Sequence, residues 1–192
     1  MNDKTPQINL QIIKAINTLD ISSERLSIKK FSSDEIEYNI QHEMDAEIMR
    51  YIREPLPIEE TRERTEKCAK NWSGNESDWA LFALRLKNTN DYIGMVCFCY
   101  ESIENNTVEM GWRLGHEAMG KGYATEAAKQ VLDFIKTEIK PHKVVAYCIA
   151  ENIASSNIMS KLGMEKEAHL RQFCKLGGQW QDEAIFGLIL NQ

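Results

Sequence analysis

Hydrophobic and polar positions along this chain follow two rhythms, one typical of helices and one typical of strands. Apolar residues at helical spacing in residues 1–22 predict a short amphipathic helix that packs against the rest of the protein. The same spacing predicts helices at 33–52, 58–72, 124–140 and 154–162. Alternating or β-branched runs predict seven strands, at 24–31, 79–86, 92–101, 107–114, 143–150, 165–174 and 183–190.

The order of these elements favours one domain of mixed α/β (α+β) class, with strands in runs early and helices interleaved late. Ser33 is placed as the N-cap of the helix at 33–52, and Gly177-Gly178 as the turn of a closing hairpin. We expect residues 1–22 to form an N-terminal helical extension and residues 23–192 to form the main domain.

The segment from Gly115 to Ala127 joins the predicted strand 107–114 to the predicted helix 124–140. A glycine-bearing turn that opens a helix exposes unpaired backbone N–H groups beside the positive end of the helix dipole, and this arrangement binds phosphate. Gly120 and Gly122 lack Cβ, so the backbone can approach an anion closely and adopt positive φ. The pattern therefore predicts a site for a phosphorylated ligand.

A nucleotide-hydrolysing P-loop is the nearest general alternative, because Gly115 to Lys121 matches the first seven positions of that motif. The eighth position is Gly122, which lacks the hydroxyl that holds Mg²⁺. The next apolar strand, 143–150, contains no Asp to serve as the second acid. These two absences argue against nucleoside triphosphate hydrolysis.

Bulk composition indicates an ordinary globular protein, with 43% hydrophobic and 27% charged residues in 192. No apolar run reaches the ~20 residues that span a membrane, and residues 1–11 lack the pattern of a signal peptide. Five cysteines without a C-x-x-C pair favour reduced thiols and a cytoplasmic location. No cluster of His and Cys at ligand spacing predicts a metal site.

The net charge of −6 is unevenly distributed and disfavours nucleic acid and anionic membranes as partners. Eleven acidic and five basic side chains lie between Ser33 and Lys67, so this segment carries a charge equal to that of the whole chain. Two interpretations stay open: a solvated helix surface, or a field that attracts a cationic substrate.

The glycine segment resembles the acetyl-CoA loop of the GNAT family of N-acetyltransferases, whose pattern is [QR]-x-x-G-x-[GA]. Here the pattern runs from Glu117 to Gly122, and Glu117 departs from the Gln or Arg of the first position. The continuation through Ala127 is similar to the RimJ/RimL-like branch of that family. Further landmarks of this branch occur in order, at Glu24–Ile28, Glu109–Trp112, Glu151–Ser155, Lys161–Met164 and Gly178–Asp182.

The resemblance implies a GNAT fold, with a mostly antiparallel mixed sheet whose fourth and fifth strands, 107–114 and 143–150, splay apart. In that family the pantetheine arm of acetyl-CoA lies between the two strands; acetyl-CoA is therefore the expected co-substrate, and no metal is expected. A backbone N–H near Leu114 would then face the thioester oxygen. The implied cofactor-binding residues are Arg113, Leu114, Gly115, Gly120, Lys121, Gly122, Tyr123, Ala124, Thr125, Asn152 and Ser155.

The resemblance also implies two catalytic positions. Glu109 lies on the strand that leads to the loop and is the candidate general base; a solvent-facing strand Glu is the alternative. Glu101 is a weaker substitute. Many GNAT proteins carry a Tyr as proton donor to the thiolate, but that position is Met159 here. Ser155 is the candidate partner of the sulfur, and it is also a residue type favoured at helix starts.

The function that these residues imply is acetyl-CoA-dependent transfer of an acetyl group to a primary amine, by direct attack in a ternary complex. Expected acceptors are a protein N-terminus, a polyamine, an aminoglycoside or a similar small amine. Met159 keeps an alternative of another class open, a catalytically silent acyl-CoA-binding regulatory module. A homodimer through the N-terminal helix or the closing strands is also possible.

Overall fold

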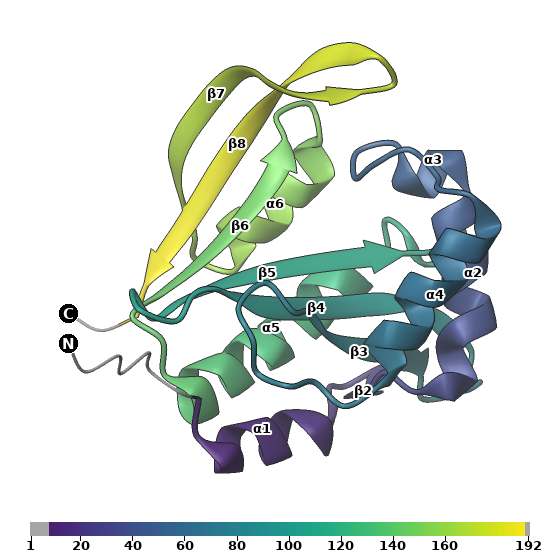
Figure 1. Ribbon diagram of the computed structural model, residues 1–192, viewed down its shortest axis with the longest axis vertical. Helices are drawn as coiled ribbons and strands as arrows, with labels where there is room; N and C mark the ends of the chain where they lie inside the picture. The colour runs from purple at the N-terminus through teal and green to yellow at the C-terminus, as the bar shows by residue number, and fades with distance from the viewer. Residues whose placement is uncertain (1–7, 191–192) are drawn as a thin grey trace.

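The chain is built around one sheet whose neighbouring strands are antiparallel at every step except one (Figure 1). The computed structural model describes residues 8–190. Within them the strand order is β1-β2-β3-β4-β5-β6-β8-β7, and only β5 and β6 run parallel. The strands are β1 (Asp20–Ser22), β2 (Leu26–Lys30), β3 (Ala80–Leu86), β4 (Tyr92–Ser102), β5 (Thr107–Leu114), β6 (Lys143–Ile149), β7 (Glu165–Leu176) and β8 (Gln179–Ile189).

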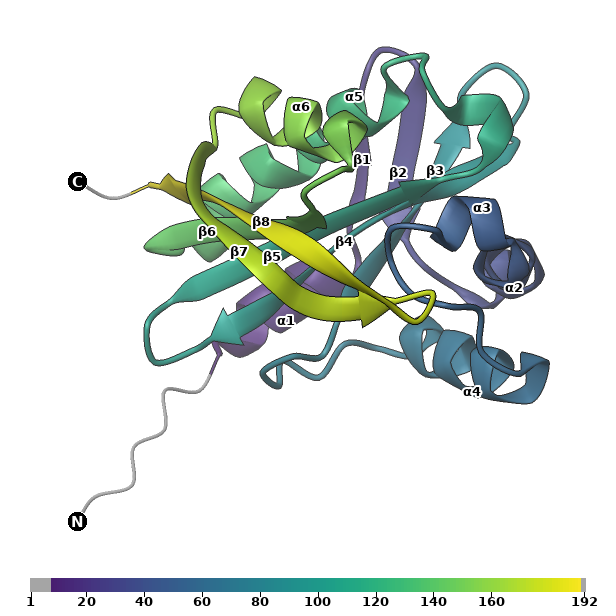
Figure 2. The same cartoon turned by 90° about the horizontal axis from the view of Figure 1, so that it is seen from above.

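Helices cover both faces of the sheet (Figure 2). One face carries α1 (Leu10–Asn17), α5 (Tyr123–Phe134), the single π-helical turn η3 (Ile135–Ile139) and α6 (Ile153–Lys161). The other face carries the 3₁₀ turn η1 (Ser33–Glu35), α2 (Ile36–Met44), α3 (Ala46–Met49) and α4 (Ile58–Ala69). A further 3₁₀ turn, η2 (His116–Ala118), follows β5.

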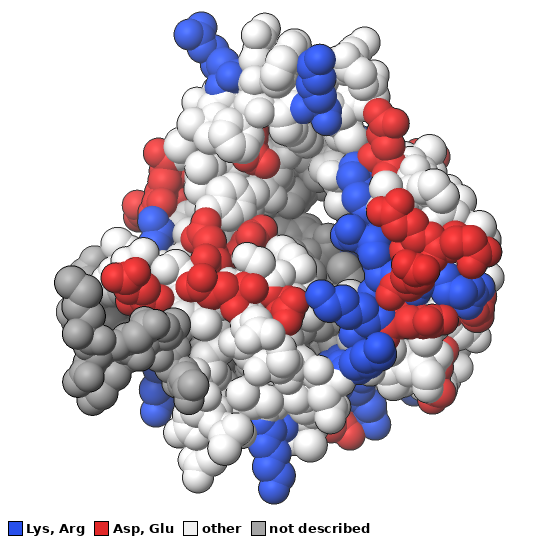
Figure 3. Space-filling view, in the orientation of Figure 1, with Lys and Arg blue, Asp and Glu red and all other residues white. Residues whose placement is uncertain are grey.

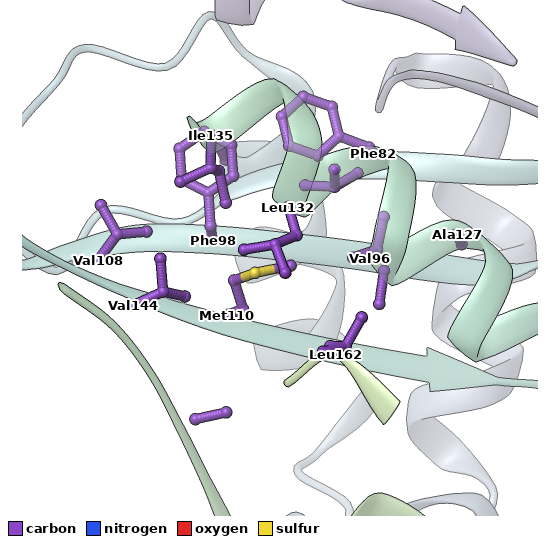
Figure 4. Packing of buried hydrophobic residues seen from close by; sticks show 14 of the residues in the cluster. Phe82, Val96, Phe98, Val108, Met110, Ala127, Leu132, Ile135, Val144 and Leu162 are labelled. Atoms are coloured by element: carbon purple, nitrogen blue, oxygen red, sulfur yellow. The ribbon is translucent and has the colours of Figure 1, made fainter. Parts of the chain in front are cut away.

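The main core lies between the sheet and α5, because both elements present apolar side chains at their own period. Phe82, Val96, Phe98 and Met110 project from β3, β4 and β5 towards Leu132 of α5 (Figure 4). Each of these five side chains is at most 2% exposed. Burial on this scale stabilises the fold by roughly 1.5–3 kcal/mol per large side chain.

The parallel pair β5–β6 opens into a fork. Only three register pairs join the strands, and the last one is Glu109 with Val145. Beyond this pair β5 continues to Leu114 and β6 to Ile149 without further pairing. Figure 1 shows β6, β8 and β7 rising away from β5 after this point. The splay that was expected between these two strands is therefore present, and Glu109 marks its closed end.

Several boundaries differ from the prediction. The helix expected at 33–52 is broken at Asp45, whose carboxylate accepts from the backbone N–H groups of Glu47 and Ile48 and so caps α3. At the start of this helical segment the N-cap is Ser32 and not Ser33; Ser32 caps the 3₁₀ turn η1 and forms a capping box with Glu35. The last turn of the helix expected at 124–140 is π-helical. The turn at Gly177-Gly178 is confirmed.

The N-terminal region contributes a strand that the hydrophobic pattern did not predict. Asp20–Ser22 pairs with Ser27–Lys29 of β2 and becomes an edge strand, so the sheet has eight strands where seven were expected. Ile16 and Leu19 lie buried in the main core, as the amphipathic stripe predicted. Residues 1–7 of the expected extension lie outside the described residues.

The sequence also led to expectations about the cysteines and about membrane-spanning segments. Cys97 joins the core cluster beside α4, while Phe98 and Tyr100 join the opposite cluster, as strand alternation predicted. All five cysteines are free thiols. Between residues 8 and 190, no helix combines the length and the apolar character needed to cross a bilayer.

Candidate active site

The fork presents unpaired backbone groups of β5. The N–H of Gly115 donates to the carbonyl of Ile93 on the β4 side at 3.0 Å, and Leu114 lies opposite Gly94. Because successive N–H groups of a strand point to opposite sides, the N–H of Leu114 points away from β4 and into the fork. This is the direction in which an N–H must point to reach a group lying between β5 and β6.

The loop after β5, residues 115–122, ends in two glycines with left-handed backbone. Gly120 has φ of 72° and Gly122 has φ of 81°, a region that side chains with Cβ adopt at a cost. No atom lies within 4 Å of a Cβ built on Gly120. The backbone conformation therefore requires these glycines, and the space over Gly120 is open to a ligand.

Gly122 is also the N-cap residue of α5, and no side chain caps this helix. The first N–H groups of an α-helix lack acceptors within the helix. In the described part of the chain, no hydrogen bond uses the backbone N–H groups of Lys121 to Thr125. Together with the helix dipole, these free donors favour an anion at this position.

Arg25, on the turn before β2, lies against this loop and was not singled out from the sequence. Its guanidinium donates to the Lys121 carbonyl at 3.0 Å and to the Glu126 carboxylate at 2.6 Å. It also lies 4.4 Å from the centre of the Tyr123 ring. The pairing joins residues 101 positions apart in the chain, so no local pattern could reveal it.

Glu109 is half-buried at the closed end of the fork. Burial, followed by the negative charges of Glu101 and Glu183, raises the pKa of its carboxyl group from its ordinary value of 4.5 to about 7. A carboxylate with this pKa is a stronger base than an exposed one and is about half protonated near neutral pH. This environment differs from the solvent-facing alternative that the sequence left open.

The groups around Glu109 come from three other strands. Glu101 lies next to the last residue of β4, Tyr147 lies on β6 and Glu183 lies on β8. The Tyr147 hydroxyl donates a hydrogen bond to the Glu101 carboxylate. Burial, and then this bond, raises the pKa of the Tyr147 phenol above its usual range. Neither Tyr147 nor Glu183 was a sequence candidate, because only the strand order of the fold brings β6 and β8 to the same region as Glu109.

Asn152 and Ser155 lie where β6 leads into α6. The Asn152 side-chain oxygen accepts from the backbone N–H of Ser155 at 3.1 Å, so Asn152 caps α6. In residues 8–190 no hydrogen bond uses the Asn152 amide nitrogen or the Ser155 hydroxyl, and both groups stay available to a ligand. Met159 is 1% exposed and belongs to the core, so this position supplies no proton donor.

The side chain of Arg113 turns away from the fork and into a buried polar network. Its Nη2 donates to the Asn39 side-chain oxygen at 2.5 Å, and its Nη1 lies 3.3 Å from the Glu43 carboxylate. Glu43 also pairs with Arg53. The network fixes α2 and the segment after α3 to β5. The contribution expected of Arg113 to a cofactor site is thus limited to its backbone.

Two pockets border the site. One, of about 310 Å³, lies between residues 46–55 and the tip of the β7–β8 hairpin, and is lined by Arg50, Tyr51, Glu151 and Gln181 among others. The other, of about 360 Å³, lies beside the loop and is lined by His42, Tyr92, Gly115 and His116 among others. His116 pairs with Asp45 at 3.1 Å, which joins the start of the loop to the cap of α3.

Charge on this face follows the fold (Figure 3). Acidic side chains gather near the closed end of the fork, whereas acidic and basic side chains mix over α2 and α4. Within the acidic segment 33–67, Glu37 pairs with Arg62 and Glu43 pairs with Arg53. Salt bridges therefore offset part of the helical charge, while Glu101, Glu109 and Glu183 concentrate negative charge at the fork. Among the described residues, no group of three or more His, Cys, Asp or Glu is arranged to hold a metal ion.

Known proteins are similar to this chain in sequence and in fold. Residues 25–165 match the family model described as an acetyltransferase (GNAT) domain. The uncharacterized N-acetyltransferase YnaD of Bacillus subtilis (strain 168) is 30% identical over 173 residues, which is 89% of this chain and 97% of that protein.

Solved structures are also similar, among them the following two. An acetyltransferase of the GNAT family from Bacillus anthracis is 28% identical with a TM-score of 0.78, covering 91% of this chain and 100% of the other. The spermidine N-acetyltransferase of Vibrio cholerae, in complex with CoA and spermine, has a TM-score of 0.76 at 19% identity, covering 88% and 97%. The fork, the glycine loop and these matches lead to one conclusion: the chain belongs to the GNAT family of N-acetyltransferases.

Proposed function

We propose that this protein transfers an acetyl group from acetyl-CoA to a primary amine by direct attack in a ternary complex. The observation that carries the proposal is the fork between β5 and β6, which is closed at Glu109 and opens towards the loop. In the proposed complex the pantetheine arm of acetyl-CoA lies in the fork. The pyrophosphate of acetyl-CoA lies on the free N–H groups of Lys121 to Thr125, where the α5 dipole favours an anion.

The chain's own groups then have defined roles. The N–H of Leu114 polarises the thioester carbonyl and stabilises the oxyanion that forms when the amine nitrogen attacks. Glu109 takes the proton that the amine must lose, because its pKa of about 7 suits proton transfer near neutral pH. The C–S bond breaks, and the CoA thiolate leaves with the Ser155 hydroxyl as its candidate hydrogen-bond donor. The Asn152 amide nitrogen holds the pantetheine arm.

The acceptor that fits the closed end of the fork is a cationic amine. Glu101 and Glu183 add negative charge beside Glu109, and such a group attracts an ammonium ion before it is deprotonated. A polyamine, an aminoglycoside, a protein N-terminus and similar small amines all carry such an ammonium group. The structurally similar spermidine N-acetyltransferase, solved with spermine, supports including polyamines in this set.

Met159 motivates one alternative, a catalytically silent module that binds acyl-CoA. Turnover distinguishes the two functions. Release of CoA from acetyl-CoA is measured against a panel of spermidine, an aminoglycoside and short peptides with free N-termini. We expect CoA release with at least one cationic amine and thermal stabilisation of the protein by acetyl-CoA. Stabilisation without turnover on any amine favours the silent module, and stabilisation by Mg-ATP alone refutes the proposed donor.

A further inference from the structure

Arg25 makes four interactions that all converge on the start of α5. Its Nε donates to Oε2 of Glu126 at 2.6 Å, and its Nη2 lies 2.6 Å from the same oxygen. Its Nη1 donates to the carbonyl of Lys121 at 3.0 Å, and its guanidinium lies over the Tyr123 ring. One side chain therefore contacts the residue before Gly122, the residue after it and the first turn of the helix.

The other carboxylate oxygen of Glu126, Oε1, accepts two further hydrogen bonds. The Ser23 hydroxyl donates to Oε1 at 2.6 Å, and the backbone N–H of Arg25 donates to the same oxygen at 2.8 Å. The Glu126 side chain is 17% exposed and that of Arg25 is 43% exposed. The turn before β2 is thereby attached to the first turn of α5 by charge-assisted hydrogen bonds, the stronger class of such bonds.

Arg25 offsets the repulsion between the Glu126 carboxylate and a phosphate bound at the start of α5. A carboxylate in the first turn of a helix is favourable for the isolated helix but repels a phosphate that approaches the same N–H groups. Arg25 neutralises Glu126 at direct contact and orders the turn. Its guanidinium lies next to Gly122, since Nη2 is 3.5 Å from a Cβ built on that glycine. Arg25 thus places positive charge beside these free N–H groups.

We propose that Arg25 is a positioning residue of the donor site: it holds the Gly120–Gly122 turn in its anion-receiving shape and offsets the charge of Glu126, so that a donor carrying a pyrophosphate can bind. This inference rests on the proposed function, because it takes acetyl-CoA as the donor. It adds a role for a residue outside the loop, set by the packing of β2 on α5.

The test compares two acetyl donors that differ in the group on which Arg25 is proposed to act. Acetyl-CoA carries the pyrophosphate, and S-acetylpantetheine has the same thioester and arm without it. For Arg25→Ala we expect KM for acetyl-CoA and Kd for CoA to rise roughly tenfold, while KM for S-acetylpantetheine stays within twofold. The double variant Arg25→Ala/Glu126→Gln regains part of the loss, because the repelling carboxylate is gone.

Matched controls separate this effect from general damage. Arg62→Ala removes an exposed Arg–Glu pair between α4 and α2, and it should leave both donors unaffected. If Arg25→Ala does not fold, Arg25→Lys is measured in its place. Lysine keeps the positive charge, but its single nitrogen cannot replace the three guanidinium nitrogens that contact Glu126 and Lys121. We then expect a smaller rise in KM, seen with acetyl-CoA and not with S-acetylpantetheine. Circular dichroism confirms the fold of each variant.

The outcomes distinguish the inference from the proposed function. A wild-type protein that binds neither CoA nor acetyl-CoA overturns the proposed function and this inference with it. A wild-type protein that binds both, with an Arg25→Ala variant that binds CoA equally well, overturns the inference alone. An equal loss with acetyl-CoA and S-acetylpantetheine also overturns it, since the role of Arg25 would then be independent of the phosphates.

Discussion

The hydroxyl of Tyr147 on β6 donates a hydrogen bond to the carboxylate of Glu101 on β4, although β5 lies between these two strands. The bond passes over the face of β5 that carries Glu109, which pairs with Cys99 of β4 and Val145 of β6. It holds the Glu101 charge near Glu109 instead of leaving it free to turn into solvent. The electrostatics of the closed end of the fork therefore depend on a contact between strands that are not neighbours.

Glu109→Gln tests the proposed base. The wild-type kcat should rise with pH through a midpoint near 7, because Glu109 must lose its proton before it can accept one from the amine. In the variant this rise of kcat with pH should be absent, and kcat should be about 10²–10⁴-fold lower than in the wild type. KM for acetyl-CoA should stay near the wild-type value. An unchanged pH profile in the variant would exclude Glu109 as the base.

The same residue links activity to stability. The pKa of Glu109 is higher in the folded protein than in the unfolded chain, so the folded state binds more protons between pH 4.5 and about 7. The contribution of Glu109 to stability therefore falls as pH rises through this window. Thermal melts of wild type and Glu109→Gln should differ least at pH 4.5 and most at pH 8, with the variant the more stable protein at pH 8.

Glu101→Gln tests the influence of the neighbouring charge. Because the Glu101 carboxylate raises the pKa of Glu109, its removal should shift the midpoint of the kcat profile to lower pH. Glu138→Gln, on the exposed side of the π-helical turn, serves as the matched control and should leave the midpoint in place. A midpoint that moves to higher pH in Glu101→Gln would contradict this account of the cluster.

Three glycines allow backbone strain to be separated from ligand binding. Gly120, Gly122 and Gly163 all have positive φ, and Gly163 lies beyond α6, away from the loop. Substitution by Ala at each position should cost roughly 1–2 kcal/mol of stability through the left-handed backbone. Only Gly120→Ala and Gly122→Ala should also raise Kd for CoA, as isothermal titration would show. Equal CoA affinity in all three variants would remove the loop from the donor site.

Arg113→Met tests the buried network between β5 and α2. The Arg113 side chain is 5% exposed and that of Glu43 13%, so loss of the guanidinium leaves Asn39 and Glu43 with fewer partners in a region shielded from water. We expect destabilisation of about 2–4 kcal/mol in urea unfolding, since Arg53 still pairs with Glu43. The exposed pair lost in Arg62→Ala should cost less than about 1 kcal/mol. Similar costs for the two variants would argue against a structural role for the network.

His42 provides a pH test on the other side of the site. Burial, followed by the nearby charge of Arg113, lowers the pKa of its imidazole from 6.5 to about 4. The unfolded chain binds a proton that the folded protein does not, so stability should fall as pH drops from about 6.5 to 4. His42→Gln should flatten this part of the stability curve. The exposed His142→Gln is the control and should retain the wild-type slope.

Local pattern was sufficient for elements whose residues determine their own conformation. The strand at Thr107–Leu114 has the bounds that its alternation predicted, and the hairpin turn at Gly177-Gly178 lies where two glycines allow positive φ. The pattern failed at β1, which has three residues and no periodicity of its own. That segment is a strand because β2 offers it hydrogen bonds. The break at Asp45 was missed because the apolar spacing continues through it.

The sequence by itself determined the glycine loop, the strand before it, the helix after it and the position of Glu109, since each follows from short-range spacing and from the conformational freedom of glycine. Tertiary structure decided which charges surround Glu109 and which side chain braces the loop. Tyr147, Glu183 and Arg25 come from distant segments, and their roles depend on strand order and on the packing of β2 beside α5. The pKa of a carboxyl group and the shape of an anion-binding turn are set by burial and by neighbouring charges, which exist only when the chain is folded.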